Sequence, residues 1–269
     1  INILNNNLMI KPRKNIERLD RFKDFGYDRS TFVRLDKNER TVPFTQEIYQ
    51  GMLATLSNKF LPMYPDQRPL YEKLSKFFSI DKENLLLTSG SDSAIKSIYE
   101  TYVENGDKVI YLWPTYAMID VYADMFMAEK VKIEYSSQLE LNFESLLKKI
   151  DGNAKVVFVA NPNQPTGTLL DEKQVHDLIK KTEKTETLLV FDEAYQQFSG
   201  QESTIKYVEK FSHVIVVQTF SKAFGLASAR LGYIITQKNN INCLYKVKSY
   251  SDINFFALKL GEYLLENYW

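Results

Sequence analysis

From residue 71 onward, the sequence alternates between short apolar segments and segments with helical periodicity. Strands are expected at residues 84–88, 108–112, 130–135, 155–160, 188–191, 213–217 and 230–235. Helices are expected at 71–79, 93–104, 116–128, 142–149, where Asn142 fits the N-cap position, and 172–184. Short apolar strands that alternate with amphipathic helices form βαβ units. The pattern therefore predicts an α/β fold built on a mostly parallel sheet.

Ligands of parallel sheets bind beyond the carboxyl ends of the strands, so the residues that follow each strand are informative. Ser91 and Asp92 follow strand 84–88, where free N–H groups of the first helical turn can hold a phosphate. On the local sequence alone an ordinary helix cap is the favoured explanation, because caps of this kind are common. Strand 155–160 is followed by NPNQPTG (161–167). The side-chain amides of this loop either donate hydrogen bonds to a ligand or form hydrogen bonds with the loop's own backbone.

Two further strands are followed by side chains that can take part in catalysis. Strand 188–191 leads into Asp192 and Tyr195, and a carboxylate buried at a strand end needs a cationic partner unless it caps a helix. Strand 213–217 leads into Ser221 and Lys222. If the lysine is not simply on the surface, its small neighbours remove its hydration and favour a free amine that can attack an aldehyde.

One ligand requires all of these groups, namely pyridoxal 5′-phosphate (PLP). Its aldehyde reacts with a lysine, and its ring nitrogen is held protonated by a carboxylate. Its phenolate oxygen accepts hydrogen bonds, and its phosphate binds backbone N–H groups, hydroxyls and a cation such as Arg230. Each of these groups can be explained more simply when it is considered alone. The occurrence of all of them at successive strand ends favours a PLP site.

Composition excludes several other classes of protein. The 269 residues contain 34 basic and 34 acidic side chains, which disfavours nucleic acid or an anionic membrane as a partner. Cys243 is the only cysteine, so no internal disulfide can form, and a cytoplasmic location is expected. No apolar stretch approaches the length of a membrane span, and no metal site is expected.

Seven stretches carry a resemblance to a known family. They are LDKNE (35–39), YPD (64–66), SGSDSAI (89–95), PTY (114–116), NPNQPTG (161–167), DEAY (192–195) and SKAFGLASARLGY (221–233). In order and spacing they resemble the fold-type I PLP-dependent enzymes of class I/II, and most closely the histidinol-phosphate aminotransferase-like branch. The similarity covers residues 31–269, and its last three stretches are the most specific.

The resemblance implies a role for each matching residue. Lys222 would form the Schiff base with the cofactor, Asp192 would pair with the ring nitrogen, and Tyr195 would bond the ring oxygen O3′. The phosphate would be held by Ser91, Asp92, Ser221 and Arg230, and Tyr116 would stack on the ring.

Other implied roles concern the edges of the site. Asn38 would border the substrate, and Tyr64 would reach the phosphate of a partner subunit, so a homodimer is expected. Most family members have asparagine directly before the Pro-Thr-Gly of their loop. Here that residue is Gln164, preceded by Asn163, and both are expected to contact the cofactor.

The resemblance also implies a domain organisation. Residues 1–30 would form an N-terminal arm, and 31–255 a three-layer αβα domain that binds PLP around a mostly parallel seven-stranded sheet. Residues 256–269 would begin a helix that leads to a C-terminal small domain missing from this chain. In the family, that domain carries the arginines that hold the substrate.

The expected function is transamination of a small, phosphorylated amine or amino acid, with an oxo acid as the second substrate and ping-pong kinetics. A PLP-dependent decarboxylase of a phosphorylated amino acid shares every motif and remains an alternative. A non-catalytic PLP-binding module, as in aminotransferase-like transcription regulators, is disfavoured by the short N-terminal arm. A dinucleotide-dependent dehydrogenase is disfavoured because no G-x-G-x-x-G follows the first strand.

Overall fold

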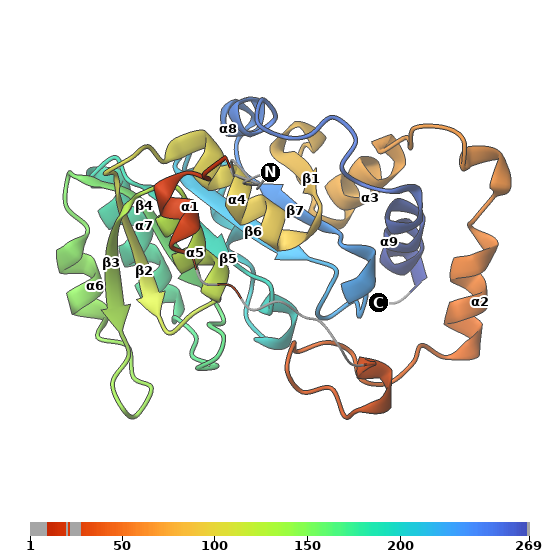
Figure 1. Cartoon of the computed structure of the whole chain (residues 1–269), viewed down its shortest axis with the longest axis horizontal. Helices are drawn as coiled ribbons and strands as arrows, with labels where there is room; N and C mark the ends of the chain where they lie inside the picture. Colours follow the sequence, from red (N-terminus) through yellow and green to blue (C-terminus); the bar gives the residue numbers. More distant parts are fainter. Residues whose placement is uncertain (1–9, 20, 22–27, 268–269) are drawn as a thin grey trace, which may run out of the picture.

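The computed structural model describes residues 10–19, 21 and 28–267 and contains a seven-stranded sheet in the order β1-β7-β6-β5-β4-β2-β3 (Figure 1). The strands are β1 (Leu85–Thr88), β2 (Lys108–Trp113), β3 (Glu129–Glu134), β4 (Ala154–Ala160), β5 (Leu188–Asp192), β6 (Val214–Thr219) and β7 (Gly232–Ile235). Strands β3, β2, β4, β5 and β6 pair in parallel, whereas β7 is antiparallel to β6 and β1. The predicted α/β fold with a mostly parallel sheet is confirmed.

Nine α-helices lie in the described part of the chain. They are α1 (Lys14–Glu17), α2 (Gln46–Ala54), α3 (Arg68–Phe78), α4 (Gly90–Tyr102), α5 (Ala117–Met125), α6 (Phe143–Lys149), α7 (Glu172–Lys184), α8 (Lys238–Leu244) and α9 (Phe255–Asn267). None of these described helices has the length and apolar character needed to cross a membrane. The five helices expected within 71–184 are all present, and the side chain of Asn142 caps α6 as expected.

Several boundaries differ from the prediction, and three of these differences have local backbone reasons. Helix α4 starts at Gly90, which takes a φ of 80° at the turn that leaves β1. Helix α5 ends at Met125, before Met127, whose φ is 57°. Strand β7 starts at Gly232 and not at Arg230, because Arg230 has a left-handed backbone with a φ of 52° and cannot pair in a sheet.

Helices cover both faces of the sheet, which gives three layers. Alternate residues of a strand point to opposite faces. In β4, Val156 and Phe158 belong to the core under α4, α5 and α8, whereas Val157 and Val159 belong to the core under α3, α6, α7 and α9. Strands buried on both faces must be apolar throughout, and this is why the sequence shows continuous apolar runs.

Figure 1 shows α2, which lies within residues 32–64, on the far side of α9 from the strands. Helix α2 contacts α9, where Gly51 lies against Tyr263. Large apolar side chains of this segment are exposed, namely Val33, Leu35, Val42, Tyr49, Leu53, Leu61, Met63 and Tyr64. An extended segment that exposes so many apolar side chains is typical of a protein interface.

The start of α4 approaches β7 so closely that Gly232 has no room for a side chain. A Cβ atom there would lie 2.6 Å from Gly90 C and 2.6 Å from Ser91 N, both of which are backbone atoms. This contact fixes the N-terminus of α4 against the end of β7. The position of the helix end therefore depends on a glycine in a different part of the sequence.

We expect Gly232→Ala to lower the free energy of unfolding by about 1 to 3 kcal/mol, because backbone atoms must move to admit the methyl group. Chemical denaturation measures the effect. Gly152→Ala is the matched control, because nothing lies within 4 Å of the Cβ that it would add. Equal unfolding free energies for the two variants would contradict the proposed close packing.

Candidate active site

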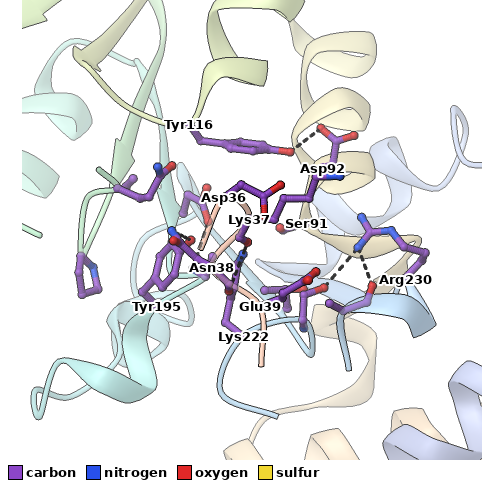
Figure 2. Close-up of a pocket in the computed structure, with 18 of the residues that line it drawn as sticks. Asp36, Lys37, Asn38, Glu39, Ser91, Asp92, Tyr116, Tyr195, Lys222 and Arg230 are labelled. Atoms are coloured by element: carbon purple, nitrogen blue, oxygen red, sulfur yellow. Dashed lines mark hydrogen bonds between the residues drawn. The ribbon is translucent and has the colours of Figure 1, made fainter. Parts of the chain in front are cut away.

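A cavity of about 660 Å³ lies at the carboxyl ends of β4, β5 and β6, where the lining includes Ala160, Asp192 and Thr219. It brings together most of the residues singled out in the sequence: Asn38, Ser91, Asp92, Tyr116, Gln164, Asp192, Tyr195, Ser221, Lys222 and Arg230. Figure 2 shows Asp92 and Arg230 on one side of it and Tyr195 on the other, with residues 36–39 between them. The strand ends therefore converge on one site.

Asp192 is the last residue of β5, and its side chain is almost completely buried, with 5% of the residue exposed. Among the described residues its carboxylate accepts one hydrogen bond, from Ala194 N at 3.1 Å. Burial raises the pKa of Asp192 to about 6, and the charge of Glu193 adds to this effect. A buried carboxylate with unfilled acceptor sites is suited to pair with a protonated ring nitrogen.

Lys222 extends from the segment after β6 into the middle of the cavity. Its Nζ donates to the backbone carbonyl oxygens of Lys37, at 2.8 Å, and Asn38, at 3.2 Å. It also lies 5.3 Å from the ring centre of Tyr195. Lys222 is half-buried, and it lines the same cavity as Asp192.

A phosphate-binding arrangement lies at the end of the cavity formed by the first turn of α4. Arg230 Nη1 donates to Ser221 Oγ at 3.3 Å and to Ala227 O at 3.2 Å. A Cβ on Gly90 would lie 2.6 Å from Arg230 Nη2, so the glycine lets the guanidinium approach the helix N-terminus. An arginine, a hydroxyl and a helix N-terminus together form a site for an anion such as phosphate.

Two tyrosines hold the side chain of Asp92. Tyr122 Oη donates to Asp92 Oδ1 at 3.0 Å, and Tyr116 Oη donates to the same oxygen at 3.3 Å. Burial raises the pKa of Tyr116, and the charge of Asp92 raises it further. The ring of Tyr116 is thereby fixed in the cavity wall in its neutral form.

Tyr195 and Asn38 meet across the opening of the cavity. Asn38 Nδ2 donates to Tyr195 Oη at 3.0 Å, although 156 residues lie between them in the sequence. Asn38 has a φ of 49°, a left-handed conformation that asparagine tolerates better than most residues. The segment that contains Asn38 therefore forms part of the cavity wall.

Two predicted site residues lie elsewhere. Asn163 is buried and does not line this cavity: its Nδ2 donates to Pro114 O at 3.0 Å and to Thr166 Oγ1 at 2.8 Å. Its Oδ1 accepts from Thr115 Oγ1 at 2.8 Å, so the amide fixes the loop itself and is not directed at the cofactor space. Tyr64 is 84% exposed and is also absent from the cavity lining.

The structure adds cavity residues that the sequence analysis missed, namely Arg29, Asp36, Lys37, Glu39 and Thr219. Arg29 Nη2 contacts Asp36 Oδ1 at 2.6 Å and Glu39 Oε1 at 3.2 Å, and Arg34 Nε contacts the same Glu39 oxygen at 2.6 Å. These ion pairs hold residues 36–39 over Lys222. The LDKNE stretch marked the segment, but backbone carbonyl groups that bind a lysine leave no sequence signal.

The groups around this cavity fit PLP: an amine, a buried carboxylate with free acceptor sites, and an anion site at a helix N-terminus. The fold and the site thus define a fold-type I, PLP-dependent protein.

Comparison with known proteins identifies the family. Residues 30–251 match the family "Aminotransferase class I and II". Histidinol-phosphate aminotransferase 1 of Carboxydothermus hydrogenoformans is 32% identical over 263 residues, which cover 96% of this chain and 74% of that protein. Histidinol-phosphate aminotransferase of Caldanaerobacter subterraneus is 29% identical over 93% of this chain and 72% of that protein.

A solved structure agrees with the fold. The histidinol-phosphate aminotransferase from Sinorhizobium meliloti, in complex with pyridoxal 5′-phosphate, superposes with a TM-score of 0.78 at 23% identity. The match covers 86% of this chain and 64% of that chain, so this chain spans about two thirds to three quarters of these similar proteins. The chain belongs to the class I and II aminotransferases.

The pKa of Asp192 predicts a pH dependence of stability in the protein without cofactor. The pKa of Asp192 is raised to about 6 from an ordinary 3.8. At pH values between these two, Asp192 is therefore protonated in the folded state and ionised in the unfolded state. The contribution of Asp192 to stability therefore falls as pH rises from about 4 to about 6, by about 2 to 3 kcal/mol. We expect Asp192→Asn to remove this decline, as measured by denaturation at a series of pH values.

Asp151→Asn is the control, because the hydrogen bond from Lys108 lowers the pKa of this exposed carboxyl. Its contribution has the opposite sign, so this variant should keep the decline. A wild-type profile that rises between pH 4 and 6 and is unaltered in Asp192→Asn would contradict the assignment.

Proposed function

We propose that this chain contributes the cofactor site of a PLP-dependent aminotransferase that acts on a small, phosphorylated amine or amino acid. The observation that carries the proposal is the convergence of Lys222 Nζ and the buried carboxylate of Asp192 on one cavity that also has an anion site. The similar proteins named histidinol-phosphate aminotransferase support the phosphorylated substrate. The second substrate is an oxo acid that receives the amino group.

Different residues around the cavity would bind different parts of the cofactor. Lys222 would bind the aldehyde carbon, and Asp192 would hold the proton of the ring nitrogen. Tyr195 and Gln164 are suited to donate to the ring oxygen, and Tyr116 offers the face of its ring. The phosphate would bind the backbone N–H groups of Ser91 and Asp92 together with Ser221 and Arg230.

When bound, PLP supplies a ring that accepts electrons from the reacting carbon of the substrate. The protein must hold the ring nitrogen protonated, and the desolvated carboxylate of Asp192 does this because a cation is its best partner there. Lys222 Nζ would be the base that moves the proton from the substrate's Cα. Residues 36–39 lie over this amine and limit its exposure to water.

The exposed apolar segment 32–64 supports a homodimer. Tyr64 is 84% exposed, and its neighbours Leu61 and Met63 are also exposed. In the dimer Tyr64 would reach the cofactor phosphate of the partner subunit. The single cysteine, itself exposed, is compatible with function in the reducing cytoplasm.

Lys222→Ala should abolish the visible absorption band that PLP acquires on binding and should lower the transamination rate by about 10²- to 10⁴-fold or more. The assay follows conversion of 2-oxoglutarate to glutamate with histidinol phosphate as the donor. Lys173→Ala is the control, since this lysine on α7 is exposed and pairs with Asp177. A band that persists in Lys222→Ala would refute the assignment of the amine.

A second measurement on the same protein distinguishes transamination from the alternative decarboxylase function. Phosphoserine or phosphothreonine is added with PLP, and released carbon dioxide is measured beside glutamate formation. We expect glutamate without stoichiometric carbon dioxide. Carbon dioxide released without consumption of an oxo acid would replace transamination by decarboxylation at the same site.

The double variant Leu61→Asp/Met63→Asp should be monomeric and bind PLP more weakly, because charges placed in an apolar interface lose hydration on association. Sedimentation velocity measures the mass. Leu139→Asp, which alters an exposed leucine in the turn after β3, is the control and should remain dimeric. A monomeric wild-type protein with full PLP affinity would contradict the proposed dimer.

A further inference from the structure

A second buried carboxylate, Glu193, lies directly behind Asp192. Only 1% of Glu193 is exposed, and it does not line the cofactor cavity. Val190 of β5 packs in the core beside α4, and Phe191 packs in the core on the other face. Continuing this alternation, Asp192 faces α4 and the cavity, and Glu193 faces the opposite side of the sheet. The mechanism described above makes no use of Glu193.

Glu193 is held by four hydrogen-bond donors. Its Oε1 accepts from Thr204 N and Thr204 Oγ1, each at 2.7 Å. Its Oε2 accepts from Gln218 Nε2 at 2.8 Å and from Ser203 Oγ. Burial raises the pKa of Glu193, and these four donors oppose the rise. Two of the donors, a backbone N–H and an amide NH₂, cannot reverse their direction, so they favour the ionised form of the carboxylate.

The orientation of Gln218 is itself fixed. Gln218 Oε1 accepts from Tyr233 Oη at 2.8 Å and from Gln197 Nε2 at 3.1 Å. In this orientation the amide presents its NH₂ group to Glu193. The network links the residue that follows β5 to strands β6 and β7.

Glu193 consequently joins the three segments that carry the reactive groups. Its own backbone follows Asp192 directly, and Glu193 N donates to Val217 O of β6 at 2.8 Å. Its bonds to Ser203 and Thr204 close the loop that begins with Tyr195. Its bond to Gln218 secures the end of β6, four residues before Lys222.

The charge of Glu193 also acts on its neighbour. The groups that interact electrostatically with Asp192 are Glu193, Lys222 and Tyr116. Lys222 favours the ionised form of Asp192, whereas Glu193 opposes it, and Tyr116 is held neutral. A fixed anion behind Asp192 therefore increases the negative potential that a protonated ring nitrogen experiences in the cavity.

We propose that Glu193 is a positioning residue of the PLP site, whose buried carboxylate fixes Asp192, Tyr195 and Lys222 relative to one another and adds a negative charge behind the cofactor ring. This inference rests on the proposed function. Glu193 has two separable effects: its hydrogen bonds fix distances, and its charge favours the protonated states of the bound cofactor.

The test uses the protein loaded with PLP in the absence of substrate. The absorption spectrum is recorded over a range of pH, and the midpoint of its change is determined for the wild type and for Glu193→Gln. Loss of the charge should lower the midpoint by about one pH unit. It should also lower kcat by about tenfold, with KM within about twofold of the wild-type value. An unchanged midpoint would overturn the proposed effect of the charge.

Glu193→Asp separates the two effects because it keeps the charge and shortens the reach. Its midpoint should return to the wild-type value while kcat stays reduced. Glu262→Gln is the matched control: Glu262 is a carboxylate on α9, 9% exposed, that pairs with Lys259 and does not line the cavity. If the midpoint falls equally in Glu262→Gln, the loss of any buried charge has this effect, and the specific role of Glu193 is overturned.

Should Glu193→Gln fail to fold, Glu193→Met/Gln218→Met removes the charge and one of its donors together, which limits the number of unpaired polar groups. The same downward shift is expected, and its absence overturns the proposal. The outcomes also distinguish failure of the proposed function from failure of the proposed role of Glu193. A wild type that forms no absorption band with PLP refutes the proposed function, whereas a normal wild type with unshifted Glu193 variants refutes only the role of Glu193.

Discussion

The burial of β4, β5 and β6 on both faces is the constraint on which the rest of the structure depends. Helices cover each face, so the buried central parts of these strands are apolar. Polar groups can occur only where the strands emerge from the two cores, which is where Asp192, Thr219 and the segment with Lys222 are found. The same packing that stabilises the sheet thus concentrates reactive side chains at one edge.

At that edge, two adjacent carboxylates have different environments. Asp192 accepts one hydrogen bond among the described residues, so it retains capacity for a cationic ligand. Glu193 accepts four and is saturated. The difference follows from strand geometry, because consecutive residues face opposite sides of the sheet. One carboxylate faces the cavity, and the other faces a network that links the neighbouring segments.

The sequence predicted the site residues unevenly, and the reason is physical. Residues at or just beyond the end of a strand, such as Asp192 and Ser91, could be proposed because strand ends of a parallel sheet converge. Asn163 lies in a loop whose own backbone groups compete for its amide, and the structure shows that the loop uses it. Residues 36–39 could be placed only by resemblance, since their contact with Lys222 involves backbone carbonyls and a sequence separation of more than 180 residues.

The sequence by itself determined the α/β class, the seven strands and the order in which chemical groups follow them, because periodicity and strand ends are local properties of the chain. Only the tertiary structure decided that β7 runs antiparallel, that Arg230 reaches the start of α4 past Gly90, and that Glu193 bonds to Gln218. These features depend on distances between segments far apart in the sequence. Such distances are set when both faces of the sheet are packed, and no local pattern encodes them.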